Sequence, residues 1–487
     1  MSNKHLKHII VMCLLLLPPY INMEVRADIR QICVLSDLHV MAPSLIDSQD
    51  NRAWQEDLAF KKTMQELSAP IFDVLVEQIK RRKPDLLLIA GDLTKDGERE
   101  SHEYVLKKLR EIKDAGIPIY VIPGNHDRGY MEQARKYAND TYTEAEQFSN
   151  DDFRAAYADY GYGSDSEYYQ SSLTYATEPL QGLTLIGIDT GIWCAVSDGA
   201  LAWVTEKAKE AQQKGNQVIV MMHHLLMPHY QNQNELEELA IPQNYVDIRR
   251  ELMNAGIKVV LTGHTHISDI ARYTDENGRE IYDIATGSPI SYPCDYRTLI
   301  LNDATLQLMV TTTNLTQLEG YADFPRYAAG RLERSITDWA TRWVKERTGS
   351  ELAASLVAPE IAAYFKIHAE GNEPHNPDAV KELELFEAIK KVYDGTAFPA
   401  LFATAESCVR SMLGNYPSED DESNVVNDRT LSIKLNAAET GITAPSRQST
   451  SPSIWYTLEG MRLAQKPTQA GIYIHNGRKV VITKNNF

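Results

Sequence analysis

Residues 117–127 read Ile-Pro-Ile-Tyr-Val-Ile-Pro-Gly-Asn-His-Asp: an apolar run stops at Pro123-Gly124, and three polar side chains follow at once. Such a run predicts a buried parallel strand, and open α/β sheets carry their functional side chains just beyond the carboxyl ends of these strands. Four more apolar runs end in the same way: Ile32–Ser36 before Asp37-Leu38-His39, Leu86–Ala90 before Gly91-Asp92, Val218–Met222 before His223-His224, and Lys258–Thr262 before Gly263-His264-Thr265-His266. Five strand ends that carry Asp, Asn or His predict a shared site.

From Asp28 to about Thr313 the chain alternates between strand and helix patterns. Two helical stripes, Trp54–Lys83 and Ser101–Ala115, separate the first three strands, and this order predicts a parallel sheet with right-handed crossovers. After His266 the strands alternate apolar and polar residues, as antiparallel strands do. A parallel half followed by an antiparallel half predicts two stacked sheets with helices outside. The remaining expected elements are strands at Leu183–Ile188, Ile267–Tyr273, Ile281–Ile284, Arg297–Leu301 and Leu306–Thr312 and helices at Ala200–Lys214 and Tyr245–Ala255.

The chain has 487 residues, more than one typical core, so two or more domains are expected. After the α/β region the apolar spacing becomes helical, and a later stretch rich in Ser, Thr, Asn and Pro is typical of a linker. We divide the chain into residues 1–27 (signal peptide), 28–320 (α/β domain), 321–415 (helical domain), 416–453 (linker) and 454–487 (small β module). The helical stripes are Leu332, Ile336, Trp339, Trp343 and Val344, then Leu383, Leu385, Ile389, Val392 and Tyr393.

The formal net charge is −18, which disfavours a long nucleic acid as a partner because such binding rests mostly on phosphate neutralisation. A small phosphate ester is compatible with this charge. Near the N-terminus, Lys4 and Lys7 precede the apolar run Ile9–Leu17, which is too short to span a bilayer. This order predicts a signal peptide cut after Ala27, and hence a secreted or periplasmic protein without a transmembrane helix; an uncleaved anchor is the alternative.

The segment Arg128–Tyr175 interrupts the alternation and is rich in tyrosine. It follows a loop with functional side chains, so one hypothesis is a lid whose tyrosines stack on a base. The alternative, favoured for each single tyrosine, is packing against the domain. Two cysteines, Cys194 and Cys294, lie in loops where an oxidising compartment would permit a disulfide; unpaired thiols are an equal alternative.

The residue types at the five strand ends favour metal ions. Carboxylate, amide and imidazole groups without a thiolate suit Mn, Fe or Zn, and the two oxygens of Asp92 can bridge two ions. Two such ions about 3.5–4 Å apart lower the pKa of a shared water and stabilise in-line displacement at phosphorus. We expect one ion at Asp37, His39, Asp92 and His266 and the other at Asp92, Asn125, His223 and His264.

Three residues beside these ligands receive other roles. His126 is predicted to donate a proton to the leaving alkoxide, and Asp127 is predicted to orient its imidazole. His224 is a candidate for contact with the substrate, and a purely structural role is its alternative. Histidines without a strand-end context are expected to be structural: His102, His229, His368, His375 and His475.

Asp37-x-His39, Gly91-Asp92, Gly124-Asn125-His126-Asp127, His223 and Gly263-His264-x-His266 together resemble the motif set of the calcineurin-like metallophosphoesterases. The resemblance covers about Asp28 to Thr313. It implies a four-layer α/β/β/α sandwich with a dinuclear site, and it matches the ligand sets above. The chain looks most similar to the branch with class III cyclic-nucleotide phosphodiesterases, some of which carry a helical C-terminal domain. The similar purple acid phosphatases have a tyrosine ligand at the position of Lys95.

The expected activity is therefore hydrolysis of a phosphodiester, with cyclic nucleotides among the candidates, by attack of a hydroxide that bridges the two ions. Phosphomonoesterase or 5′-nucleotidase activity is the first alternative, because these enzymes share the core motifs. A metal-poor binding scaffold is the second. The C-terminal runs Tyr456–Gly460 and Gly471–Ile474 resemble sorting modules of the type IX secretion route, which favours export.

Overall fold

The structure is a computed structural model, and its described residues fall into two compact units that divide after Thr440. Unit 1 is described over residues 29–371, except 60, 130, 131 and 238, and over 373, 381–382, 384, 387, 407–412 and 427–435. In unit 2 the backbone of 455–457, 462–463, 471–475 and 478–482 is described. The predicted signal peptide and the second helical stripe lie outside these residues.

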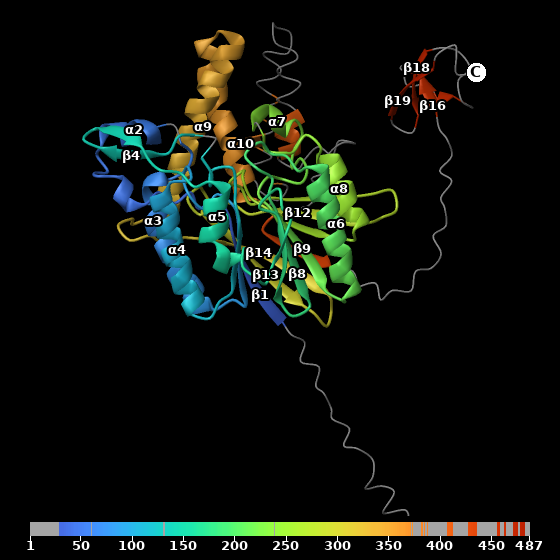
Figure 1. Ribbon diagram of the computed structural model, residues 1–487. Helices are drawn as coiled ribbons and strands as arrows, with labels where there is room; N and C mark the ends of the chain where they lie inside the picture. The colour runs from blue at the N-terminus through green and yellow to red at the C-terminus, as the bar shows by residue number, and fades with distance from the viewer. Residues whose placement is uncertain are drawn as a thin grey trace, which may run out of the picture. The chain divides into compact units, whose positions relative to one another are not determined.

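Two mixed sheets form the centre of unit 1 (Figure 1). The first has the strand order β15-β14-β13-β1-β2-β3, and the second has the order β11-β12-β10-β9-β8-β7-β6. The first sheet consists of β1 (Ile29–Leu35), β2 (Leu86–Ala90), β3 (Ile119–Ile122), β13 (Asp295–Asn302), β14 (Gln307–Asn314) and β15 (Thr430–Lys434). The second consists of β6 (Glu167–Tyr168), β7 (Tyr175–Leu180), β8 (Leu183–Ile188), β9 (Gln217–Met222), β10 (Val259–Thr262), β11 (Ile270–Thr274) and β12 (Glu280–Ala285).

Helices cover the outer faces of both sheets, which confirms the four-layer α/β/β/α sandwich. In Figure 1, α3 (Ser68–Arg82) and α4 (Arg99–Asp114) lie on one flank, and α6 (Asp198–Gln213) and α8 (Tyr245–Asn254) lie on the other. Strand β9 shows why its sequence is continuously apolar. Ile219 and Met221 belong to the core between the sheets, whereas Val220 and Met222 pack with the residues of α6 and α8.

The predicted parallel opening is confirmed, because β1, β2 and β3 pair in parallel. The predicted pair of sheets is also present, and each sheet contains strands from both halves of the region. Strand β13 pairs antiparallel with β1 and completes the first sheet, whereas β12 pairs in parallel with β10 in the second. Alternation in a sequence reports which faces are buried, but the partner of a strand depends on contacts distant in the chain. A turn at residues 275–278 joins β11 to β12, which pair antiparallel.

The single helix predicted over Trp54–Lys83 is two helices, α2 (Arg52–Leu58) and α3, with a loop and a short 3-10 turn between them. Pro70 accounts for the break. Proline has no N–H and clashes with the carbonyl four residues earlier, so it is tolerated in the first turn of α3 but not in the interior of a longer helix. The loop that results carries Lys61 and Lys62.

The tyrosine-rich segment holds the hairpin of β4 (Arg135–Ala138) and β5 (Thr141–Glu144) and the helix α5 (Asn150–Ala156). Tyr157, Tyr160 and Tyr162 are at most 5% exposed and belong to the main core. The hypothesis of a lid that stacks on a base is wrong for these three residues, and the packing alternative is confirmed. Cys33, Cys194, Cys294 and Cys408 are buried free thiols, so Cys194 and Cys294 are not paired.

After β14 the chain forms two long helices, α9 (Phe324–Thr348) and α10 (Glu351–Glu370), which rise from the body in Figure 1. The Asp323 side chain accepts a hydrogen bond from the first turn of α9, and Gly349 ends that helix at φ 66°. Leu332, Ile336 and Val344 of the first predicted stripe are buried. None of the described helices combines the length and apolar character needed to cross a bilayer.

The linker prediction for residues 416–453 is wrong for Thr430–Lys434. These residues are β15, which pairs with β14 and extends the first sheet. Their alternating pattern is short and lies within a polar stretch, so the polar composition of the region predicted a linker. Ile433 is the buried residue of the strand. In unit 2, where a small β module is predicted, an antiparallel sheet is formed by β16 (Trp455–Thr457), β17 (Arg462–Leu463), β18 (Gly471–His475) and β19 (Arg478–Ile482).

Strand β15 yields a stability prediction. Ile433→Asp places a carboxylate in the core and is expected to lower the free energy of unfolding by about 3 kcal/mol or more. Ser432→Asp is the matched control, because Ser432 is exposed on the opposite face of the same strand; it is expected to change stability by less than about 0.5 kcal/mol. Urea unfolding followed by circular dichroism measures both. Equal effects of the two substitutions would contradict the placement of β15.

Candidate metal centre

Five strand ends meet at one edge of the sandwich, and each carries at least one of the predicted ligands. Three of these strands are in the first sheet and two are in the second. The ligands are Asp37 and His39 after β1, Asp92 after β2, Asn125 after β3, His223 after β9, and His264 and His266 after β10. All seven are buried or nearly so, and His126 lies beside them with 25% of its side chain exposed.

The backbone at these residues is strained. Five of the ligands have a positive φ, in the left-handed region that residues with a Cβ rarely adopt. These are Asp37 (53°), His39 (41°), Asp92 (50°), His264 (71°) and His266 (66°). Such conformations persist where the surrounding structure enforces them, and they cluster at functional sites. These left-handed residues follow β1, β2 and β10, where the chain turns and the ligand side chains come to face the neighbouring strand ends.

Two glycines of the motifs are required by close approach. A Cβ at Gly124 would lie 2.1 Å from Asp92 Oδ1, and a Cβ at Gly263 would lie 1.9 Å from Ser36 Oγ and 2.6 Å from Asp37 Oδ2. The backbone of each loop therefore passes directly against a predicted ligand of another loop. In the motifs Gly-Asn-His and Gly-His-x-His, the first position is glycine because a side chain there would collide with the carboxylate that the histidines face.

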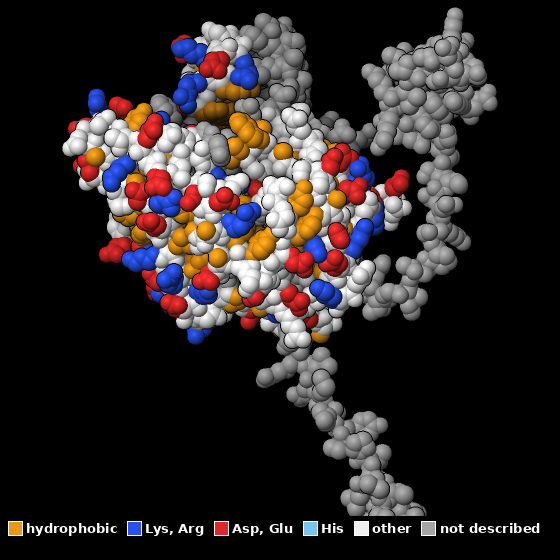
Figure 2. Space-filling view, viewed as in Figure 1, with side chains coloured by type: hydrophobic (Ala, Val, Ile, Leu, Met, Phe, Trp, Pro, Cys, Tyr) orange, Lys and Arg blue, Asp and Glu red, His pale blue; other side chains and the backbone are white. Residues whose placement is uncertain are grey.

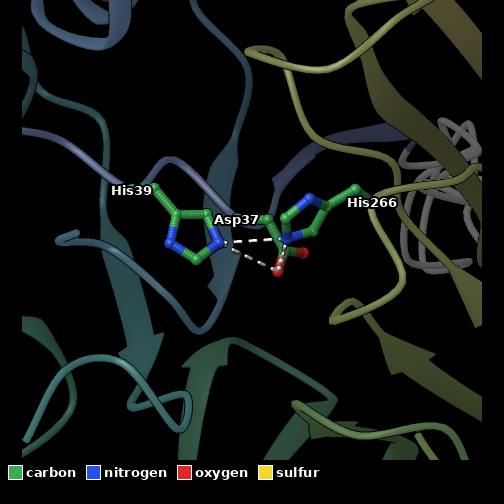
Figure 3. Close-up of side chains that lie close together, drawn as sticks. All are labelled: Asp37, His39 and His266. Atoms are coloured by element: carbon green, nitrogen blue, oxygen red, sulfur yellow. Dashed lines mark hydrogen bonds and ion pairs between the residues drawn. The ribbon is translucent and has the colours of Figure 1, made fainter. Parts of the chain in front are cut away.

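Asp37, His39 and His266 form one group of potential ligands, drawn in Figure 3. The Nε2 atoms of His39 and His266 lie 3.0 Å apart and point toward each other. Asp37 Oδ1 is 3.4 Å from His266 Nε2 and 3.8 Å from His39 Nε2. Three donor atoms converge on one point, as in a divalent metal site.

Asp92, His223 and His264 form a second group, to which Asn125 belongs through its side-chain oxygen. Asn125 Oδ1 lies 3.1 Å from His223 Nε2 and 3.0 Å from His264 Nδ1. Asp92 Oδ2 lies between the groups, 3.2 Å from His223 Nε2 and 3.4 Å from His39 Nε2. The geometry thus brings together the residues of both predicted ligand sets, with Asp92 in the bridging position; their coordination of ions stays a prediction.

The protonation states suit cation binding. Burial would raise the pKa of Asp92, but the neighbouring His223, His126 and His39 lower that pKa well below its ordinary value. Burial lowers the pKa of His39 to about 3, which leaves a neutral imidazole with a lone pair. His223 Nδ1 lies 2.8 Å from the carbonyl oxygen of Ala90 and donates to it, so Nε2 is the nitrogen that faces the centre.

His126 has a partner that the sequence analysis missed. Its Nδ1 lies 3.1 Å from Asp96 Oδ1, and Lys95 pairs with both Asp96 and Asp57. Burial lowers the pKa of His126, but Asp92 and Asp96 raise it, with a net value of about 9. The second carboxylate in the loop Gly91-Asp92-Leu93-Thr94-Lys95-Asp96 was the available sequence signal. Lys95 itself is directed away from the predicted ligands, toward carboxylates.

The prediction that Asp127 orients His126 is wrong. Asp127 is fully buried, and its carboxylate accepts hydrogen bonds from the backbone N–H of Gly124 (2.9 Å) and from the N–H and hydroxyl of Thr94 (both 3.0 Å). Adjacent residues on a turn point to opposite sides. Asp127 therefore links the β3 loop to the β2 loop, and Asp96 is the residue that pairs with His126.

His224 is 1% exposed, which does not support the predicted contact with substrate. Its Nδ1 lies 2.6 Å from the hydroxyl of Thr190, and its ring lies beside that of His264. The alternative of a supporting role fits this placement. Thr190 belongs to the loop after β8 and had no sequence signal, since a threonine after a strand is common.

The structure thus combines a four-layer sandwich with a cluster of side chains that could hold two metal ions. Residues 30–268 match the family model described as calcineurin-like phosphoesterase, so this part of the chain is a domain of that family. The resemblance seen in its motifs is thereby confirmed.

Three curated relatives share part of this region. A probable cyclic nucleotide phosphodiesterase from Synechococcus sp. is 45% identical over 51 residues, which are 10% of this chain and 18% of that protein. A probable glycerophosphodiester phosphodiesterase, GpdQ, from Arcobacter nitrofigilis is 26% identical over 146 residues (29% and 42%). A 3′,5′-cyclic-nucleotide phosphodiesterase from Nostoc sp. is 32% identical over 96 residues (20% and 30%). The chain spans less than half of the length of each relative.

Proposed function

We propose that this chain is an exported phosphodiesterase with a dinuclear metal centre. The observation that carries the proposal is the pair of ligand groups on either side of Asp92 Oδ2, with a partly exposed histidine beside them. Two potential cation positions that share one carboxylate fit chemistry at a phosphoryl group. The names of the three relatives, all phosphodiesterases, support a diester as the substrate.

The residues fit Mn, Fe or Zn, since they offer imidazole nitrogens and carboxylate or amide oxygens and no thiolate. Asp37, His39, Asp92 and His266 would hold one ion, and Asp92, Asn125, His223 and His264 the other. When bound, the two ions supply a water of lowered pKa and withdraw negative charge from the phosphoryl oxygens.

The side chains around this pair have separate tasks. His126 faces the centre and is the group placed to give a proton to the alkoxide that leaves phosphorus. Asp96 accepts from His126 Nδ1 and so presents Nε2 to the centre. Asp127 and Thr94 keep the β2 and β3 loops in register, so that Asp92 and His126 hold their separation.

Export is part of the proposal and rests on the basic start, the short apolar run Ile9–Leu17 and the small residue Ala27. The substrate class is a small phosphodiester, with cyclic nucleotides favoured by the names of two relatives. On the face drawn in Figure 2 the basic side chains are interspersed with acidic ones and form no continuous band among the described residues, so this face offers nothing that fits a long polyanion.

The first prediction of this proposal concerns substrate preference. With Mn²⁺ added, the chain is expected to hydrolyse bis(4-nitrophenyl) phosphate with a kcat/KM about tenfold or more above that for 4-nitrophenyl phosphate. Preference for the monoester would replace the proposal by the phosphatase or nucleotidase alternative. Activity on neither ester, together with less than one bound ion per chain, would favour the binding scaffold.

A second prediction separates proton transfer from metal binding. His126→Ala is expected to lower kcat about 100-fold or more while the bound metal stays unchanged, because the imidazole acts on the leaving group. His223→Ala is expected to lose bound metal. Asp96→Asn is expected to lower kcat about tenfold with little change in KM, and the control is Asp303→Asn, which pairs with Arg30 at the start of β1, the end of the strand away from the ligands. Metal analysis and steady-state kinetics measure these effects; metal loss in His126→Ala would contradict the role of His126.

A further inference from the structure

The loop between α2 and α3 carries a lysine against one of the ligand loops. Lys62 Nζ donates a hydrogen bond to the carbonyl oxygen of Thr265 at 3.1 Å. Thr265 is the residue between His264 and His266, which belong to the two ligand groups. The ammonium of Lys62 therefore lies next to the centre, although the two residues are 203 positions apart in the chain.

Lys62 has no carboxylate partner within ion-pair distance among the residues that the structure describes. Other lysines near the centre differ in this respect: Lys61 pairs with Glu132 at 3.9 Å, and Lys95 is held between Asp57 and Asp96. A lysine ammonium has three N–H donors, and the carbonyl of Thr265 takes one. In a chain of net charge −18, a cation without a counter-charge at this place fits an anion supplied by the substrate.

The hydrogen bond of Lys62 brings this loop against the ligand loop that holds His264 and His266. His266 belongs to the first ligand group, and its Nε2 lies 3.0 Å from that of His39. The loop thus borders the centre on the side of the first ligand group.

Helix α9 holds this loop in place. The guanidinium of Arg331 donates to the carbonyl of Leu58 at 3.3 Å and to that of Lys61 at 3.2 Å, and it pairs with Glu66 at 3.4 Å. Tyr327 adds a hydrogen bond to Glu66 at 3.1 Å. On the inner side, Met64 is fully buried, and its N–H donates to the carbonyl of Ile290. Both ends of the segment that carries Lys62 are therefore fixed.

We propose that Lys62 anchors an anionic phosphoryl oxygen of the substrate, and that Arg331 of α9 positions the loop that presents it. This inference rests on the proposed phosphoesterase function and assigns a task to the helical region. A lysine suits the task, because it is a compact charge on a flexible stem and can follow the phosphate as the substrate turns over. Its hydrogen bond to Thr265 fixes the amine near the centre between turnovers.

Binding of inorganic phosphate to the full chain loaded with Mn²⁺, measured by calorimetry, tests the proposal without turnover. Lys62→Gln keeps a donor for the Thr265 carbonyl but removes the charge, and it is expected to raise the Kd about tenfold. Lys62→Arg keeps the charge and is expected to stay within about threefold of wild type. Lys80→Gln is the control, since Lys80 is paired with Glu77 and Glu111 on the outer surface.

Arg331→Met tests the role of α9. It is expected to weaken phosphate binding about three- to tenfold, because the loop loses two carbonyl contacts and one ion pair. An unchanged Kd in Lys62→Gln, or no phosphate binding by the wild-type protein, overturns the anchoring role, and an unchanged Kd in Arg331→Met overturns that of α9. Phosphate binding that depends on Lys62, without hydrolysis of any ester, overturns the proposed function alone. Ester hydrolysis with unaltered binding in Lys62→Gln overturns this inference alone.

Discussion

The carboxylate of Asp92 is the constraint on which the centre depends. One of its oxygens lies within 3.4 Å of imidazole nitrogens from both sheets, and the other accepts the N–H of His126 at 2.8 Å. This needs a left-handed turn at Asp92, a glycine at position 124 and sheets stacked with their strand ends in register. The close packing of Gly187 in β8 against Ile122 in β3 shows how tightly the sheets must approach. The four-layer fold is what supplies that register.

Most of the centre could be predicted from the sequence because its signals are local. An apolar run, a glycine and a polar ligand occupy a few consecutive positions, and the rule that parallel strands end at one edge brings such stretches together. The roles of Asp96, Thr190 and Lys62 could not be predicted from the sequence, because each acts through a partner that is distant in the chain or on another turn of the loop. Strand β15 escaped for the same reason, since a short alternating segment is recognised as a strand only when β14 is beside it.

Asp127 shows a further limit of sequence reasoning. Adjacency in the chain suggested that it assists His126, yet consecutive residues on a turn point in different directions, and Asp127 instead ties its loop to Thr94. Asp96, which is 30 positions away from His126, takes the role that adjacency suggested for Asp127. In a site built from loops, the direction in which each loop turns decides which side chains pair with each other. The sequence alone indicates that direction only where a glycine is required.

A chain of buried charges links the ligand loops to the helical region. Asp283 accepts from the hydroxyl of Thr262, directly before Gly263, and from the N–H of Leu226, in the loop after His223. His229 lies 3.1 Å from Asp283 and 3.3 Å from Asp269; burial lowers its pKa, but these two carboxylates raise it to about 10, so His229 is cationic.

The network of buried charges continues into α10, where His368 lies 3.5 Å from Asp269 and pairs with Glu373. Removal of one member of such a buried network would leave an uncompensated charge and would therefore destabilise the protein. The helical region is thus joined to the centre twice, through His368 at the loops of the second sheet and through Arg331 at the loop of Lys62. These two separate attachments make α9 and α10 part of the framework of the centre.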